Sequence, residues 1–187
     1  FASKIKEQDV AHNLEWLKAN GFGGVEIAWV YPLNWREKDA ERTPRQEWLS
    51  DEWQEIVAFT KSYADSIGLG CDFTFGSLWP FGDSKVTRDE ATRKWNDSSW
   101  RQKVTVTWEH PETAYVVDHL NPSAFAKYAG RMAPALPKGE FKFAPAYFVD
   151  SWEVETKYLW TKGFAEDFKT KFGYDIRPFM DSIYEPG

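Results

Sequence analysis

The chain has 187 residues, of which 18% are aromatic, 28% are charged and 42% are hydrophobic. This composition predicts a folded protein with a buried core and excludes a disordered chain. The 23 Lys and Arg residues and 29 Asp and Glu residues give a net charge of −6, which disfavours nucleic acid and anionic membranes as partners. The single cysteine, Cys71, excludes an intrachain disulfide and a multi-thiolate metal site, and we expect it to be a small core residue.

The ends of the chain and its hydropathy bear on its cellular location. No apolar stretch approaches the roughly 20 residues that a membrane span needs. The first residue is Phe1, so we expect the numbering to begin inside a longer gene product. The lack of a signal peptide is therefore uninformative about secretion.

The first part of the chain predicts a helix followed by a buried strand. Val10, Leu14 and Leu17 recur at helical spacing within a helix expected over residues 9–19. The short apolar run over residues 23–30 is typical of a strand in a parallel sheet that is buried on both faces.

A second helix and strand are predicted next. Ser50 is a good N-cap for a helix that ends before Gly68, and a strand over residues 69–75 leads into a Gly- and Pro-rich loop over residues 76–83. The residues expected on the buried side of this helix are Trp53, Ile56, Val57, Thr60, Tyr63, Ala64 and Ile67.

Residues 84–118 interrupt this alternation, and we interpret them as an insertion. Thr87 and Glu90 have the spacing of a capping box and predict a short helix. The alternation of polar and apolar residues over 103–108 predicts an antiparallel strand.

The last third of the chain returns to helices and strands. Asn121 and Pro122 predict the start of a helix that extends to Met132. We expect a third strand over residues 141–149. We also expect a helix over residues 155–172, with Leu159, Phe164 and Phe168 toward a core.

This alternation predicts an α/β fold with a parallel sheet and right-handed crossovers. A doubly wound sheet would be indicated by a glycine-rich phosphate turn after the first strand, and none occurs there. We therefore favour a TIM-type (β/α)8 barrel. Such a barrel takes about 250 residues. Residues 1–187 are thus expected to form a partial barrel of about three βα units, with the insertion at 84–118.

In parallel α/β folds, reactive side chains lie in the loops after the strands. These loops combine aromatic rings with polar groups, which suits sugars, whose faces pack on rings while their hydroxyls need directed hydrogen bonds. The alternative is that each Trp is a core residue. The candidate residues are Trp29, Tyr31 and Asn34 in the first loop, Trp79 and Asp83 in the second, and Asp150, Trp152 and Glu153 in the third.

The sharpest local pattern is the tetrapeptide from Asp150 to Glu153. It places two carboxylates three residues apart after an apolar strand. Cleavage of a glycosidic bond requires one carboxylic acid to protonate the leaving oxygen and a second carboxylate to act on water or the sugar. The alternative is structural, with Asp150 capping the following helix and Glu153 in its first turn. Glu26, inside the first strand, is a weaker candidate for a sugar-binding or supporting residue that points into a barrel. His119 is expected to be a capping or surface residue.

Five blocks of the chain, taken together and in order, resemble bacterial α-L-rhamnosidases of glycoside hydrolase family 106 and their relatives. The resemblance implies the TIM-barrel catalytic domain of a large, multidomain, inverting exo-glycosidase that acts on plant polysaccharides and is periplasmic or secreted. The blocks are Gly23 to Ile27, Trp48 to Trp53, Gly76 to Gly82, Asp150 to Glu153 and Phe172 to Pro178.

Carried over to this chain, the resemblance makes Glu153 the general acid and Asp150 its neighbouring site carboxylate. The general base of the family is another Glu on a later barrel strand, beyond Gly187. The resemblance therefore implies that this chain carries the general-acid half of the site and is inactive alone. It further implies accessory β-domains and the rest of the barrel in the full-length protein, and calcium near the sugar, although no EF-hand-like spacing is present.

Two alternatives remain open at this point. The chain is a non-catalytic carbohydrate-binding domain whose aromatic residues only stack on sugar, or it belongs to a metal-assisted barrel hydrolase. In each case the partner is a substrate or ligand, and neither nucleic acid nor a membrane is expected.

Overall fold

The structure is a computed structural model that describes residues 5–28, 48–76, 80–104, 114–149 and 153–185. All structural statements below concern these residues. Within them, no helix has the length and apolar character needed to cross a membrane.

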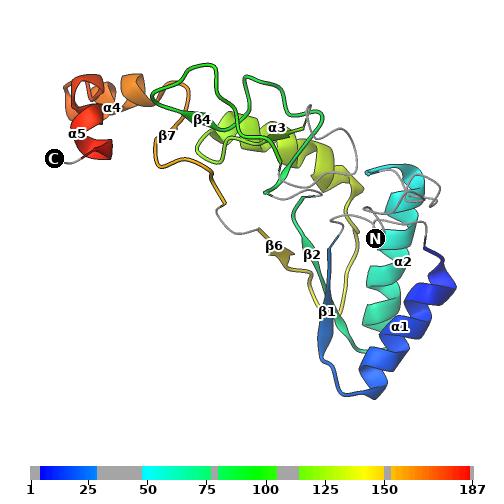
Figure 1. Ribbon diagram of the computed structural model, residues 1–187. Helices are drawn as coiled ribbons and strands as arrows, with labels where there is room; N and C mark the ends of the chain where they lie inside the picture. The colour runs from blue at the N-terminus through cyan, green and yellow to red at the C-terminus, as the bar shows by residue number, and fades with distance from the viewer. Residues whose placement is uncertain (1–4, 29–47, 77–79, 105–113, 150–152, 186–187) are drawn as a thin grey trace.

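The centre of the fold is a parallel sheet of three strands (Figure 1). The strands are β1 (Gly24–Ile27), β2 (Gly70–Thr74) and β6 (Tyr147–Phe148), and they lie in the order β1-β2-β6. Gly24 is paired with Gly70 and Phe73 with Tyr147, both in parallel register. β1 is therefore hydrogen-bonded to β2 and β2 to β6, so that neighbours in the sheet follow one another along the chain.

Three helices flank these strands in the sequence, and all three were predicted. They are α1 (Glu7–Ala19), α2 (Asp51–Ser66) and α3 (Pro122–Met132). The Ser50 hydroxyl accepts a hydrogen bond from the Trp53 N–H at 3.2 Å, which caps α2. Asn121 caps α3 by accepting bonds from the backbone N–H groups of Ser123 and Ala124. Local capping chemistry therefore sets the starts of α2 and α3.

One face of the sheet carries the main core. Figure 1 shows α1 and α2 side by side along the sheet, and the end of α3 continues through the 3-10 helix η2 (Ala133–Ala135) into the same core. Burial raises the pKa of the Cys71 thiol to about 12, so Cys71 is an inert core residue, as expected. The buried core residues are Val10, Leu14, Trp53, Ile56, Val57, Ala64, Leu69, Cys71, Phe73, Met132, Ala135 and Leu136.

The opposite face of the sheet is polar at its centre. Because side chains alternate along a strand, Glu26 and its register partner Asp72 lie on the face opposite Cys71 and Phe73. Glu26 is exposed and Asp72 is half-buried. The structure therefore confirms a mixed α/β fold with a parallel sheet whose covering helices share one core.

The third strand is shorter than predicted. Only Tyr147–Phe148 of the expected strand over 141–149 joins the sheet. Upstream, the Asp65 carboxylate accepts the N–H groups of Lys142 and Phe143 at 3.0 and 2.9 Å, and the Lys61 ammonium donates to the Phe143 carbonyl. Side chains of α2 therefore bind this backbone in place of a neighbouring strand.

The insertion forms short antiparallel pairs. Strand β3 (Gly82–Asp83) pairs with β5 (Tyr115–Val116), and β4 (Arg93–Lys94) pairs with β7 (Leu159–Trp160). Lys103 bridges to Tyr115 in antiparallel fashion, but residues 105–108 of the predicted strand lie outside the described residues.

The predicted short helix near Thr87 is wrong. Residues 88–90 form a turn, not a helix. The Glu90 carboxylate still accepts hydrogen bonds from the Thr87 N–H at 3.0 Å and the Thr87 hydroxyl at 2.9 Å. The Thr87 hydroxyl thus donates to the carboxylate, whereas in a capping box it would accept a backbone N–H at the helix start.

The predicted helix over 155–172 is wrong in its first half. Helix α4 is Phe164–Phe172, and Leu159 lies in β7. Gly163, at φ 84°, adopts the left-handed conformation that glycine tolerates, and α4 begins immediately after it. Beyond Gly173 the chain forms the 3-10 helix η3 (Arg177–Phe179) and α5 (Met180–Tyr184). Figure 1 shows α4 and α5 away from the parallel sheet.

We predict that the contacts of the Glu90 carboxylate stabilise the fold and that acid removes this stabilisation. Its carboxylate lies 2.7 Å from the Lys127 ammonium, and hydrogen bonds from Lys127 and Thr87 lower its pKa from 4.5 to about 2. A lowered folded-state pKa means that the stabilisation is complete above pH 4.5 and is lost as the pH falls toward 2. Because Lys127 is largely exposed, we expect these contacts to contribute about 1 kcal/mol to the free energy of unfolding.

Urea unfolding of the protein at pH 6 and pH 3 measures this contribution. Glu90→Gln should lower the free energy of unfolding at pH 6 and flatten its decline toward pH 3. Glu140→Gln, at an exposed position outside helices and strands, is the control and should leave the pH dependence unchanged. An identical pH dependence in wild type and Glu90→Gln would show that Glu90 is not the group responsible.

Candidate functional site

The candidate site lies beyond the carboxyl ends of the three parallel strands. These ends are Ile27, Thr74 and Phe148, and the loops after them follow the general location of sites in parallel α/β folds. The predicted site residues that lie outside the described residues, and so remain predictions, are Trp29, Tyr31, Asn34, Trp79, Asp150 and Trp152. Glu153, Asp83 and Glu26 are described.

Glu153 lies in a non-helical segment after β6. Residues 153–158 contain no helix, and the next helix, α4, begins at Phe164. The structural alternative, with Glu153 in the first turn of a helix, is therefore wrong. Glu153 is exposed, and its role as the acid remains a prediction.

The backbone around Glu153 is held by Gln102, which the sequence analysis did not single out. The Gln102 amide donates from Nε2 to the Glu153 carbonyl at 2.7 Å, and its Oε1 accepts the Glu155 N–H at 3.1 Å. Gln102 is 1% exposed. No local sequence signal marks this contact, since it joins residues about fifty positions apart in the chain.

The insertion makes further contacts to the chain after Glu153. The Trp95 N–H donates to the Tyr158 carbonyl at 2.7 Å, and β4 pairs with β7 next to it. The Thr161 hydroxyl donates to Oδ2 of the fully buried Asp118 at 2.6 Å. Burial raises the pKa of the Asp118 carboxyl. The insertion therefore contacts this stretch at Tyr158, through β7 and at Thr161.

Asp83 has protein partners at both carboxylate oxygens. Arg131 Nη2 lies 2.8 Å from Oδ1 and 2.9 Å from Oδ2, and the Lys85 N–H donates to Oδ1 at 2.9 Å. Asp83 is 4% exposed. These contacts give Asp83 a role in joining β3 to α3, and its predicted contact with sugar remains a prediction.

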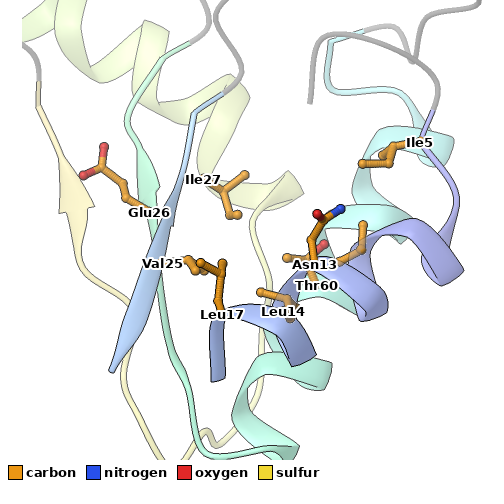
Figure 2. A pocket seen from close by; sticks show the side chains of 9 residues that line it. Ile5, Asn13, Leu14, Leu17, Val25, Glu26, Ile27 and Thr60 are labelled. Atoms are coloured by element: carbon orange, nitrogen blue, oxygen red, sulfur yellow. The ribbon is translucent and has the colours of Figure 1, made fainter. Parts of the chain in front are cut away.

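Glu26 points away from the helices. Figure 2 shows its side chain on the side of β1 opposite Val25 and Ile27. The expected orientation of Glu26 into a barrel and its role toward sugar both stay predictions.

His119 is half-buried, whereas we expected a capping or surface residue. Its ring stacks on Phe81 with centroids 4.5 Å apart and planes at 10°. Burial lowers the pKa of His119, which favours the neutral ring. These observations indicate a packing role beside the second loop.

An apolar pocket of about 260 Å³ lies between α1, β1 and α2 (Figure 2). Its polar groups are used locally, because the Thr60 hydroxyl donates to the Ile56 carbonyl and the Asn13 amide donates to the Asp9 carbonyl. Glu26 also borders it but points to the other side of the strand. This pocket therefore lacks a converging pair of reactive groups. It is lined by Ile5, Val10, Asn13, Leu14, Leu17, Val25, Glu26, Ile27 and Thr60.

Metal binding has no support in the part of the chain that the structure describes. No group of three or more His, Cys, Asp or Glu side chains is placed there to hold a metal ion. Calcium stays an expectation of the family resemblance alone, and the chemistry proposed below uses none.

Comparison of the chain with protein-family models, curated proteins and solved structures found no match.

Proposed function

We propose that the chain is part of the catalytic TIM-type barrel of an inverting, exo-acting glycoside hydrolase. Its substrates are α-L-rhamnosides or related glycosides of plant polysaccharides. The observation that carries the proposal is Glu153, which is exposed, non-helical and bound at its backbone just beyond the carboxyl end of β6. The resemblance to glycoside hydrolase family 106 supplies the substrate class.

The strand order supports the barrel. In a (β/α)8 barrel, neighbouring strands are consecutive and their helices all lie on the outer side. Here the order is β1-β2-β6, and residues of α1, α2 and the end of α3 share one core. A doubly wound sheet would reverse its order at a switch point and place helices on both faces. The remaining strands of the proposed barrel belong to the rest of the full-length protein.

In the proposed reaction, the Glu153 carboxylic acid donates its proton to the glycosidic oxygen as the bond from that oxygen to the anomeric carbon breaks. A water molecule attacks the opposite face of the sugar and gives its proton to a second carboxylate, so the anomeric configuration inverts. This base lies elsewhere in the full-length protein. Asp150 is proposed as the neighbouring carboxylate that supports Glu153 by position and charge.

The loops after the strands are proposed to bind the sugar. Their aromatic rings offer faces for the C–H groups of the ring, and their polar groups offer partners for the hydroxyls. The residues proposed for this role are Trp29, Tyr31, Asn34, Trp79, Asp83, Trp152 and Glu26. We also propose a periplasmic or secreted location, by the resemblance.

An assay of the full-length protein on aryl α-L-rhamnosides and rhamnose-containing plant polysaccharides tests the function. We expect release of a single sugar from chain ends, loss of this activity in Glu153→Gln, and retention in Glu155→Gln. Glu155 is also exposed and lies two residues away, so it controls for the loss of charge in this segment.

Two outcomes would favour the other classes of protein. Sugar binding that survives Glu153→Gln, with no hydrolysis by the full-length protein, would indicate a carbohydrate-binding domain. Activity that chelation abolishes and that Glu153→Gln leaves intact would indicate a metal-assisted hydrolase.

A further inference from the structure

The insertion at 84–118 contains a buried side-chain amide, that of Gln102, which binds the backbone at the candidate acid Glu153 and at Glu155. Gln102 uses its donor on the Glu153 carbonyl and its acceptor on the Glu155 N–H, at 2.7 and 3.1 Å. A carbonyl and an N–H two residues apart are thus held by one planar group. This fixes both the position and the direction of the backbone next to Glu153.

Gln102 is itself firmly placed. Its N–H donates to the Thr92 carbonyl at 3.3 Å, and its carbonyl accepts the Val116 N–H at 3.1 Å. Thr92 in turn donates from its hydroxyl to the Val117 carbonyl at 2.9 Å. Gln102 and Thr92 are both 1% exposed. The backbone of Gln102 is therefore held by hydrogen bonds on both sides, and this fixes the place from which its side-chain amide contacts the Glu153 segment.

Losing this amide removes both contacts from the Glu153 segment. A non-helical stretch has no internal hydrogen-bond ladder, so its geometry depends on contacts from elsewhere in the fold. Among the described residues, the next backbone hydrogen bond from the insertion to this segment runs from the Trp95 N–H to the Tyr158 carbonyl, several residues further on. Gln102 is thus the contact from the insertion that lies closest to Glu153 among those described.

We infer that Gln102 is a positioning residue, which holds the Glu153 backbone so that its carboxyl group meets the glycosidic oxygen. This inference rests on the proposed function of Glu153. It assigns a purpose to the insertion, which is to carry the amide that orients the acid. A displacement of about 1 Å at a reacting group costs on the order of 100-fold in rate.

The first test measures amide hydrogen exchange in the full-length protein and needs no activity. Gln102→Met keeps the length of the side chain but removes both hydrogen-bonding groups. We expect exchange over residues 153–156 to become about 10-fold faster, as loss of a hydrogen bond predicts, with exchange over residues 70–74 unchanged. Gln54→Met is the matched control, because the side-chain amide of Gln54, in α2, also donates to a backbone carbonyl, that of Leu49 just before the helix. It should leave residues 153–156 unchanged.

The second test measures kcat and KM on a natural glycoside. Gln102→Met should lower kcat by about 10- to 100-fold with little change in KM, because positioning of the acid affects the chemical step more than binding. In a Glu153→Gln background, Gln102→Met should cause almost no further loss. Gln102→Asn keeps the amide but is one methylene shorter. It should show the same pattern, which guards against misfolding of the Met variant.

The results separate this inference from the proposed function. Unchanged exchange at 153–156, or equal loss of kcat with and without Glu153, would overturn the role of Gln102 even if Glu153 is the acid. Normal activity of Glu153→Gln would overturn the proposed function, and the positioning of an acid by Gln102 with it. Faster exchange at 153–156 in that case would show that Gln102 only holds the segment.

Discussion

Glu153→Gln in the full-length protein should lower kcat on a natural glycoside by about 10²- to 10⁴-fold, the usual contribution of a general acid. The kcat on an aryl glycoside whose leaving group is an acidic phenol should fall much less, because that leaving group departs without a proton. The ratio of the two losses separates proton donation from a structural effect, which would reduce both rates alike.

Asp150→Asn provides the comparison for this experiment. A residue that supports charge or position should impair both substrates to a similar degree, since its effect does not depend on the leaving group. Equal losses on the two substrates for Glu153→Gln would remove its assignment as the acid. Near-normal activity on both would leave the segment without a catalytic role.

Breaking the ion pair between Asp83 and Arg131 should lower the free energy of unfolding by about 3 kcal/mol. The side chains are 5% and 25% exposed, and removing one partner leaves the other charge poorly solvated. Asp83→Asn and Arg131→Met should each show this loss in urea unfolding. The double variant should lose less than the sum of the two, because neither charge is then left alone.

Asp175→Asn is the matched control for this prediction. Asp175 pairs with Arg177 at 2.7 Å, but their side chains are 33% and 47% exposed. Because this pair is exposed, we expect Asp175→Asn to lower the free energy of unfolding by less than about 1 kcal/mol. If Asp83→Asn leaves stability unchanged but weakens sugar binding, Asp83 is a substrate residue and its contact with Arg131 is secondary.

The regular part of the fold was predictable because its signals are local. Ser50 and Asn121 cap α2 and α3 as their residue types predict, and the helical spacing of Val10 and Leu14 marks the buried side of α1. The order of helices and strands then indicated a parallel sheet. Caps and periodicity involve neighbours in the sequence, so they are readable without the tertiary structure.

The errors share a different origin, which is contact between distant segments. Leu159 fits a helical pattern, yet it lies in β7 because it pairs with Lys94 of the insertion in an antiparallel ladder. The segment before β6 has the composition of a strand, yet Asp65 and Lys61 of α2 bind its backbone. In each case a partner far away in the chain outweighed the local preference.

The same limit applies to the candidate site. Glu153 was identified because it follows an apolar strand beside Asp150. Gln102, which binds the backbone at Glu153, was not identified from the sequence, because a lone Gln in an insertion has no sequence signature. The partner of Asp83 was also missed, since Arg131 is 48 positions away and belongs to the pattern of α3. Residue type and spacing predict candidate reactive groups, whereas the residues that hold them in place are seen only in the folded chain.

The central claim is that the chain belongs to an inverting glycoside hydrolase. The most direct test follows the anomeric proton of the sugar by NMR in the first minutes of hydrolysis of an α-L-rhamnoside by the full-length protein. We predict that the β-anomer appears first and that the α-anomer grows later by mutarotation. Release of the α-anomer first, or no release of sugar at all, would contradict it.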